Sequence, residues 1–171
     1  MVPKWFKKPA KGFSMLETVI TVAIVAVLAT LMIPPLFEQT QAARVDATAR
    51  EMAASVRLAR AEARARNRLV YVGANNNDWS NGWRVWIDDN NETFVSGGSD
   101  VLLFEVIEVA NSMRLAFGQA SGAIFRISNS GYVETRLGNN QWAPRELTFT
   151  ICEQTHGRRL TITRRVHTSI A

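Results

Sequence analysis

The chain has 171 residues, 47% of them hydrophobic, which allows one globular domain and one long apolar element but excludes a second full domain. Its formal net charge is +5, but the charge is segregated, because the first twelve residues carry four lysines and no acid. Residues 71–153 contain five arginines and ten acids, whereas residues 154–171 contain four arginines and no acid. A uniformly basic protein is therefore excluded, and binding of an acidic partner must depend on the tail and on a helix that precedes the acidic segment.

The N-terminus joins a short basic stretch to a long apolar run. Residues 1–12 form the basic stretch, and residues 13–33 are largely apolar, with Glu17 as their one charged side chain. An α-helix over residues 13–33 would be about 31 Å long, which matches a hydrocarbon core of about 30 Å. We therefore predict a transmembrane helix over residues 13–36. Three kinds of segment fit this pattern: a secretory signal cleaved near Ala29, a signal anchor, and a leader cleaved just before the apolar run.

Glu17 distinguishes among these alternatives. A carboxylate near mid-membrane costs about 2.5–3.5 kcal/mol and usually marks a function, whereas a plain signal or anchor gains nothing from it. The stretch Lys11-Gly12-Phe13-Ser14-Met15-Leu16-Glu17 resembles the type IV prepilin cleavage motif, with cleavage after Gly12 and the acid at the fifth position of the mature chain. Pro34 falls where pilins carry a helix-kinking proline.

The resemblance implies how this N-terminus is processed and used. A membrane aspartyl protease, the prepilin peptidase, would remove the leader, residues 1–12, and N-methylate the new first residue, Phe13. Glu17 would then accept a hydrogen bond or charge from the free amine of Phe13, on its own or a neighbouring subunit. In an apolar bundle the two charges offset one another's desolvation, which favours the correct axial register. The resemblance also implies a single-pass subunit of the bacterial inner membrane, with its head in the periplasm, that joins other pilin subunits in a filament.

A second helical segment follows the two prolines. Residues 37–70 have the spacing of an amphipathic stalk helix, with a stripe of small apolar side chains repeating every four and three residues. The stripe consists of Val45, Ala49, Met52, Val56, Ala59 and Ala63. Arginines follow the same helix at Arg50, Arg57 and Arg64, and at Arg60, Arg64 and Arg68. Such a row is solvated, contacts neighbouring filament subunits or binds a polyanion.

Residues 71–171 change to the pattern of strands and turns. Breaks rich in Gly and Asn separate five β-prone runs. These runs are residues 83–87, 101–109, 123–127, 147–152 and 160–163. One long helix followed by several short strands predicts an α+β fold, in which the helix packs on a mostly antiparallel sheet.

The second half of the chain resembles the FimT/GspH branch of minor pilins and pseudopilins. The resemblance rests on the Ala/Arg-rich end of the stalk at residues 61–67, the block Gly82-Trp83-Arg84-Val85-Trp86-Ile87-Asp88, and a late strand containing Cys152 followed by a basic hairpin. Together with the N-terminal motif, these features cover most of the chain.

The tail is the candidate DNA-binding segment. Members of the branch that serve DNA uptake carry a Gly-Arg-x-Arg motif near the C-terminus, and the nearest stretch here is Arg164-Arg165-Val166-His167. Arg164 replaces the glycine and His167 replaces the second arginine. The candidate DNA-binding residues are Arg158, Arg159, Arg164, Arg165 and His167. If Leu160 and Ile162 face the core, the alternation of a strand puts Arg159, Arg165 and His167 on the opposite face.

Two functions fit these features. The first is a minor pilin of a type IV pilus that binds double-stranded DNA for uptake in natural transformation. The second is a GspH-like minor pseudopilin of a type II secretion system, a structural tip or priming subunit that does not bind DNA. The alternative to DNA binding by the tail is a solubilising basic hairpin.

Enzymatic chemistry finds little support in the sequence. We identify no catalytic residues, no metal site and no cofactor, because neither histidine has metal-ligand spacing and no nucleophile motif is present. The oxygen-rich stretch Asp88-Asp89-Asn90-Asn91-Glu92 lacks the spacing of an EF-hand loop and is interpreted as an exposed turn. Cys152 is the one cysteine, so it has no intramolecular disulfide partner, and we interpret it as a packed thiol in a strand.

Overall fold

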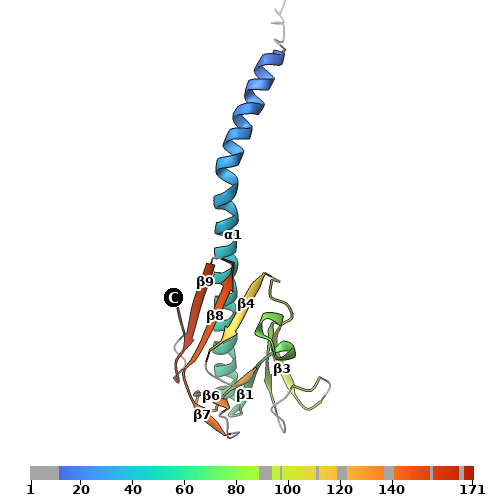
Figure 1. Cartoon of the computed structure of the whole chain (residues 1–171). Coiled ribbons are helices and arrows are strands. Elements are labelled where there is room, and N and C mark those ends of the chain that lie inside the picture. Colours follow the sequence, from blue (N-terminus) through green and yellow to red (C-terminus); the bar gives the residue numbers. More distant parts are fainter. Residues whose placement is uncertain are drawn as a thin grey trace, which may run out of the picture. The chain divides into compact units, whose positions relative to one another are not determined.

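The structure is a computed structural model, shown in Figure 1. It describes residues 12–88, 94–96, 98–110, 112–118, 123–136, 141–154, 156–165 and 168–171, with the side chains of residues 31–36 also outside the described set. The chain divides into two compact units, residues up to Gln39 and residues Thr40–Ala171, and each is described by itself.

In the first unit, the apolar run forms the beginning of the helix α1, Met15–Arg66. Thr18, Thr21 and Thr30 each donate their hydroxyl proton to the carbonyl three residues earlier, at 2.7–2.9 Å. These bonds satisfy the hydroxyl donors within the helix, so the threonines are compatible with apolar surroundings.

No helical segment among the residues whose side chains are described is long and apolar enough to cross a membrane. The predicted span over residues 13–36 and the expected kink at Pro34 include residues 31–36, whose side chains lie outside the described set. Both stay predictions.

The helix ends at Arg66 rather than near residue 70, where the sequence pattern placed its end. Asn67 adopts a left-handed conformation, with φ of 51°, and the N–H of Arg68 bonds to the carbonyl of Ala63 at 3.1 Å. This is the Schellman arrangement, which closes the last turn and prevents continuation of the helix. Val70, predicted as the last helical residue, instead begins a strand.

The second unit is built on residues 40–66 of α1, which form the body half of the helix. All six residues of the predicted apolar stripe are buried, none more than 1% exposed, and Ala53 joins them. The side chains are small, so the strands can approach the helix backbone closely. The predicted packing face of the stalk is therefore confirmed.

Two antiparallel sheets cover this face of the helix (Figure 1). The first has the order β3-β2-β1-β5-β6-β7, with β1 Val70–Ala74, β2 Trp83–Ile87, β3 Val101–Val106, β5 Ile124–Ile127, β6 Val133–Arg136 and β7 Trp142–Pro144. The second has the order β10-β9-β8-β4, with β4 Met113–Phe117, β8 Leu147–Glu153, β9 His156–Ile162 and β10 Thr168–Ile170. Two 3-10 turns, η1 Asn75–Asn77 and η2 Trp79–Asn81, connect β1 to β2.

Aromatic side chains join the two sheets in the core. Phe125 of the first sheet and Phe149 of the second lie 6.0 Å apart between ring centroids, and Trp79 packs edge-on against Phe149 at 5.0 Å. Trp83 is fully buried, and its indole N–H donates to the hydroxyl of Ser55 on α1 at 2.9 Å. Apolar burial, together with this buried hydrogen bond, thus holds the sheets against the helix, and the predicted α+β class is confirmed.

Candidate nucleic-acid interface

The processing residues lie at the start of the described chain. Gly12 and Phe13 precede the first helical residue, and Phe13 is 80% exposed. Glu17 lies in the first turn of α1, where the N–H of Glu17 bonds to the carbonyl of Ser14 at 3.0 Å. The junction after Gly12 is thus an exposed, non-helical segment, which is the form a peptidase needs. The leader up to residue 11 lies outside the described residues.

The basic tail begins in the hairpin of β8 and β9. The strand β9 pairs with β8 from His156 opposite Glu153 to Ile162 opposite Leu147. Leu160 and Ile162 are fully buried against the core, as the alternation argument required. The sequence prediction started this strand at residue 160, but pairing with β8 extends it back to residue 156. Both Arg158 and Arg159 therefore lie within a strand and point to opposite faces.

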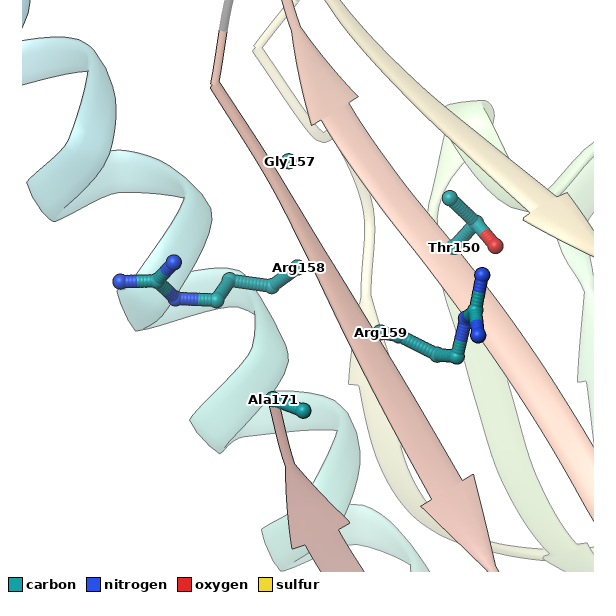
Figure 2. A pocket seen from close by; sticks show the side chains of 5 residues that line it. All are labelled: Thr150, Gly157, Arg158, Arg159 and Ala171. Carbon is teal, nitrogen blue, oxygen red and sulfur yellow. The ribbon is translucent and has the colours of Figure 1, made fainter.

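Figure 2 shows this difference between the two neighbouring arginines. Arg158 points toward α1, where its Nε donates to Oδ1 of Asp46 at 2.7 Å. Arg159 points to the other side of the sheet, over Thr150 of β8. The two arginines, with Thr150, Gly157 and Ala171, line a hollow of about 340 Å³. Arg158 is thus paired with a carboxylate, whereas Arg159 is exposed and has no ion-pair partner among the described residues.

The other two tail arginines lie beyond the far end of β9. Because β9 ends at Ile162, the strand alternation predicted for Arg165 does not extend to it; Arg164 and Arg165 form the turn toward β10, and both are exposed. At about 3.3 Å per strand residue, this turn is more than 15 Å from Arg158 along the strand. The tail arginines are therefore distributed along the whole of β9 rather than gathered in one patch. His167, the fifth candidate, lies outside the described residues.

The sequence could not place the tail against the stalk helix. Nη1 of Arg57 donates to Oγ1 of Thr168 in β10 at 3.4 Å, so a helix arginine borders the tail. These residues are 111 positions apart, and no local pattern predicts such a contact. The arginine row on the helix was noted from its spacing, but its position beside the tail comes from the structure.

A second group of aromatic side chains, Tyr71, Trp86 and Trp142, packs together outside the main core. Trp86 stacks on Tyr71 with centroids 5.8 Å apart, Trp142 meets Tyr71 edge-on at 6.1 Å, and Arg126 lies 4.5 Å above the ring of Trp142. Trp86 and Tyr71 are 2% and 6% exposed. Stacking of unpaired bases on these two rings is therefore excluded.

The remaining candidates are the oxygen-rich stretch and Cys152, and only part of the first is described. Of the oxygen-rich stretch, Asp88 is described and residues 89–92 lie outside the described set. No group of three or more potential metal ligands occurs among the described residues. Cys152 is a half-buried free thiol in β8, opposite Arg114 of β4.

Comparison with known proteins agrees with this architecture. The family model described as type II transport protein GspH matches residues 48–165, and the model of the prokaryotic N-terminal methylation motif matches residues 7–33. This chain belongs to the GspH family. The first match covers α1 from residue 48 onward and every strand of the two sheets except β10, and the second includes the predicted cleavage junction.

Individual relatives extend the assignment. The type IV narrow pilus major component PilA5 of Thermus thermophilus is 29% identical over 100 residues, which are 57% of this GspH-family chain and 86% of PilA5. The crystal structure of the type IV minor pilin FimU of Pseudomonas aeruginosa has a TM-score of 0.54 and 20% identity, covering 74% of this chain and 87% of FimU. A second crystal form of FimU gives a TM-score of 0.52. The GspH-family chain thus has the pilin fold and is a type IV pilin-like subunit of the minor pilin and pseudopilin class.

Proposed function

We propose that this GspH-family subunit is a minor pilin of a type IV pilus and that it binds double-stranded DNA during uptake. The proposal includes cleavage by the prepilin peptidase after Gly12, anchoring in the inner membrane with the body in the periplasm, and assembly with other pilin subunits. Two of the similar proteins, PilA5 and FimU, are named as pilus components, which favours a pilus over a secretion system. The role is that of a structural and binding subunit rather than an enzyme.

The observation that carries DNA binding is the exposure of tail arginines without counter-ions. Arg159, Arg164 and Arg165 are exposed, and none has an ion-pair partner among the described residues. Arg158 differs, because its pairing with Asp46 already offsets its charge. We therefore assign the phosphate contacts to the first three, and His167 stays a further candidate. Three arginine–phosphate contacts give a slope of about −2.7 in log K against log[salt] and a Kd of about 10⁻⁴–10⁻⁶ M.

The experiment uses the mature full-length protein in detergent micelles and a fluorescently labelled DNA duplex. Arg159→Gln and Arg158→Gln form a matched pair, because the two residues are adjacent, carry the same charge and point to opposite faces. We expect Arg159→Gln to lower the salt slope by about 0.9 and Arg158→Gln to leave it nearly unchanged. Equal effects of the two variants, or no binding by the wild type at low salt, would contradict the proposal.

A second candidate function rests on the family description itself, which names a type II transport protein. A pseudopilin of a secretion system would have the same fold, N-terminal processing and membrane anchor. Deletion of the gene separates the two candidates: loss of transformation with normal exoprotein secretion supports the pilus, and the reverse supports the secretion system.

A further inference from the structure

Three arginines of the stalk helix form a continuous row. Arg57, Arg60 and Arg64 occupy positions i, i+3 and i+7, so each is adjacent to the next on one side of the helix. The row covers about 10 Å along the helix axis. Burial, and secondly the charge of Arg64, lower the pKa of Arg60 below its ordinary value. Like charges are therefore concentrated on this side of the body half.

The row lies over a turn of the first sheet that also contacts the tail. Gly131, in the turn between β5 and β6, has φ of +84°, and a Cβ at this position would be 2.8 Å from Nε of Arg64 and 3.0 Å from Nε of Arg60. The two guanidinium groups thus lie directly against the backbone of this turn. Two residues later, the N–H of Val133 donates to the carbonyl of Arg164 at 3.2 Å. One short turn therefore connects the helix arginines to the tail arginines.

A second contact joins the helix arginines to the tail at the N-terminal end of the row. The hydrogen bond from Arg57 to Thr168 places the beginning of the row against β10, directly after the turn that contains Arg164 and Arg165. At one end of the row, Arg60 and Arg64 lie against the turn between β5 and β6, and at the other end Arg57 contacts β10. Both of these segments also adjoin the tail turn. The segments that carry the helix arginines and the tail arginines therefore lie close together in the second unit.

The nearby acids do not neutralise this surface. Asp46 is paired with Arg158, and Glu62 is paired with Arg66 at 2.6 Å. Among the described residues, Arg64, Arg164 and Arg165 have no ion-pair partner, and the recorded contact of Arg57 is with a neutral hydroxyl. Such a concentration of cationic side chains raises the local concentration of a polyanion.

We infer that the helix arginines and the tail arginines form one composite phosphate-binding surface, with Arg57 and Arg64 on one side and Arg164 and Arg165 on the other. The inference rests on the proposed DNA binding and names the surface that performs it. Its ligand is the backbone of duplex DNA, which carries about one negative charge per 1.7 Å of axis, so a row of about 10 Å faces several phosphates at once. Recognition of this kind is independent of base sequence.

The test compares double variants of the mature full-length chain, in detergent micelles, with the same labelled duplex. Arg57/Arg64→Gln removes the helix contribution, Arg164/Arg165→Gln removes the tail contribution, and a quadruple variant removes both. Arg66/Arg114→Gln is the matched control, because it removes the same charge from exposed arginines outside the row, one at the end of α1 about 200° around the helix from Arg64 and one on β4. Arg57/Arg64→Lys keeps the charge and controls for altered folding, which circular dichroism also monitors.

With Arg57 and Arg64 added to the three tail arginines, five contacts give a wild-type slope of log K against log[salt] of about −4.5. Each test double variant should reduce the magnitude of this slope by about 1.8, and the quadruple variant by about 3.6. The control and the lysine variant should keep a slope close to that of the wild type. If Arg57/Arg64→Gln behaves like the control while Arg164/Arg165→Gln loses binding, the composite surface is refuted and DNA binding by the tail alone survives. If the wild type does not bind, both fail. If Arg57/Arg64→Gln lowers only the recovery of the subunit in sheared filaments, the row is a contact between subunits, which also overturns the inference.

Discussion

The hydrogen bond between Trp83 and Ser55 allows a quantitative test of how the sheets are held on the helix. The indole N–H is fully buried and donates to Oγ of Ser55 at 2.9 Å, while the Ser55 hydroxyl donates to the carbonyl of Glu51 at 2.9 Å. In Ser55→Ala the indole donor loses its acceptor, and an unsatisfied buried donor costs about 1–3 kcal/mol. Alanine regains up to about 0.7 kcal/mol through its higher helix propensity. We therefore expect a net loss of about 1–2 kcal/mol in the free energy of unfolding of the body.

A double-mutant cycle isolates this bond from the effects of the single changes. Trp83→Phe removes the donor, so Ser55→Ala in that background should cost close to zero or be slightly stabilising. Unfolding of the mature protein in detergent is followed by circular dichroism for the wild type, both single variants and the double variant. A Ser55→Ala cost that is equal in the two backgrounds would refute the hydrogen bond as the source of the stability.

Two further predictions concern the N-terminus. Mass spectrometry of the membrane fraction should find a mature chain that begins at Phe13 with a methylated amine, and an intact leader or an N-terminus near Thr30 would contradict the predicted processing. Glu17→Ala should leave the protein stable in the membrane, because removal of a carboxylate eases insertion of an isolated helix, but it should lower recovery in sheared filaments; equal recovery of wild type and variant counts against pairing of Glu17 with the Phe13 amine.

Local periodicity predicted the elements whose pattern is unambiguous. The apolar stripe of the stalk and the strand β8 follow from spacing, since these segments bury one face with a regular repeat, whereas β2 follows from its β-prone composition and is buried on both faces. The strand β1 was not predicted: Val70 was assigned to the helix and residues 71–74 to no element, because the break at Asn67 depends on one left-handed residue that the helical pattern does not reveal. The strands β4, β6, β7 and β10 are short and were not predicted.

The candidate site was predictable in its residues but not in its arrangement. The alternation around Leu160 correctly put Arg159 on the outer face. The pairing of Arg158 with Asp46 joins residues 112 positions apart, so charge counting in the tail overstated the number of available arginines. The contact of the tail with Arg57 has the same origin in non-local packing. Long-range contacts of this kind follow from the two-sheet topology, which spacing along the chain does not encode.

The body half of α1 carries two stripes at once, a buried one from Val45 to Ala63 and an arginine row from Arg57 to Arg64. Because an α-helix turns by about 100° per residue, insertion or deletion of one residue after Val45 would rotate every later side chain out of its place. A deletion would turn the arginines toward the core, and an insertion or a deletion would turn small apolar residues away from it. This stretch of the gene should therefore tolerate substitutions at exposed positions but hardly any change in length. Insertions of about seven residues, which are close to two full turns, are the smallest that restore both stripes to their faces.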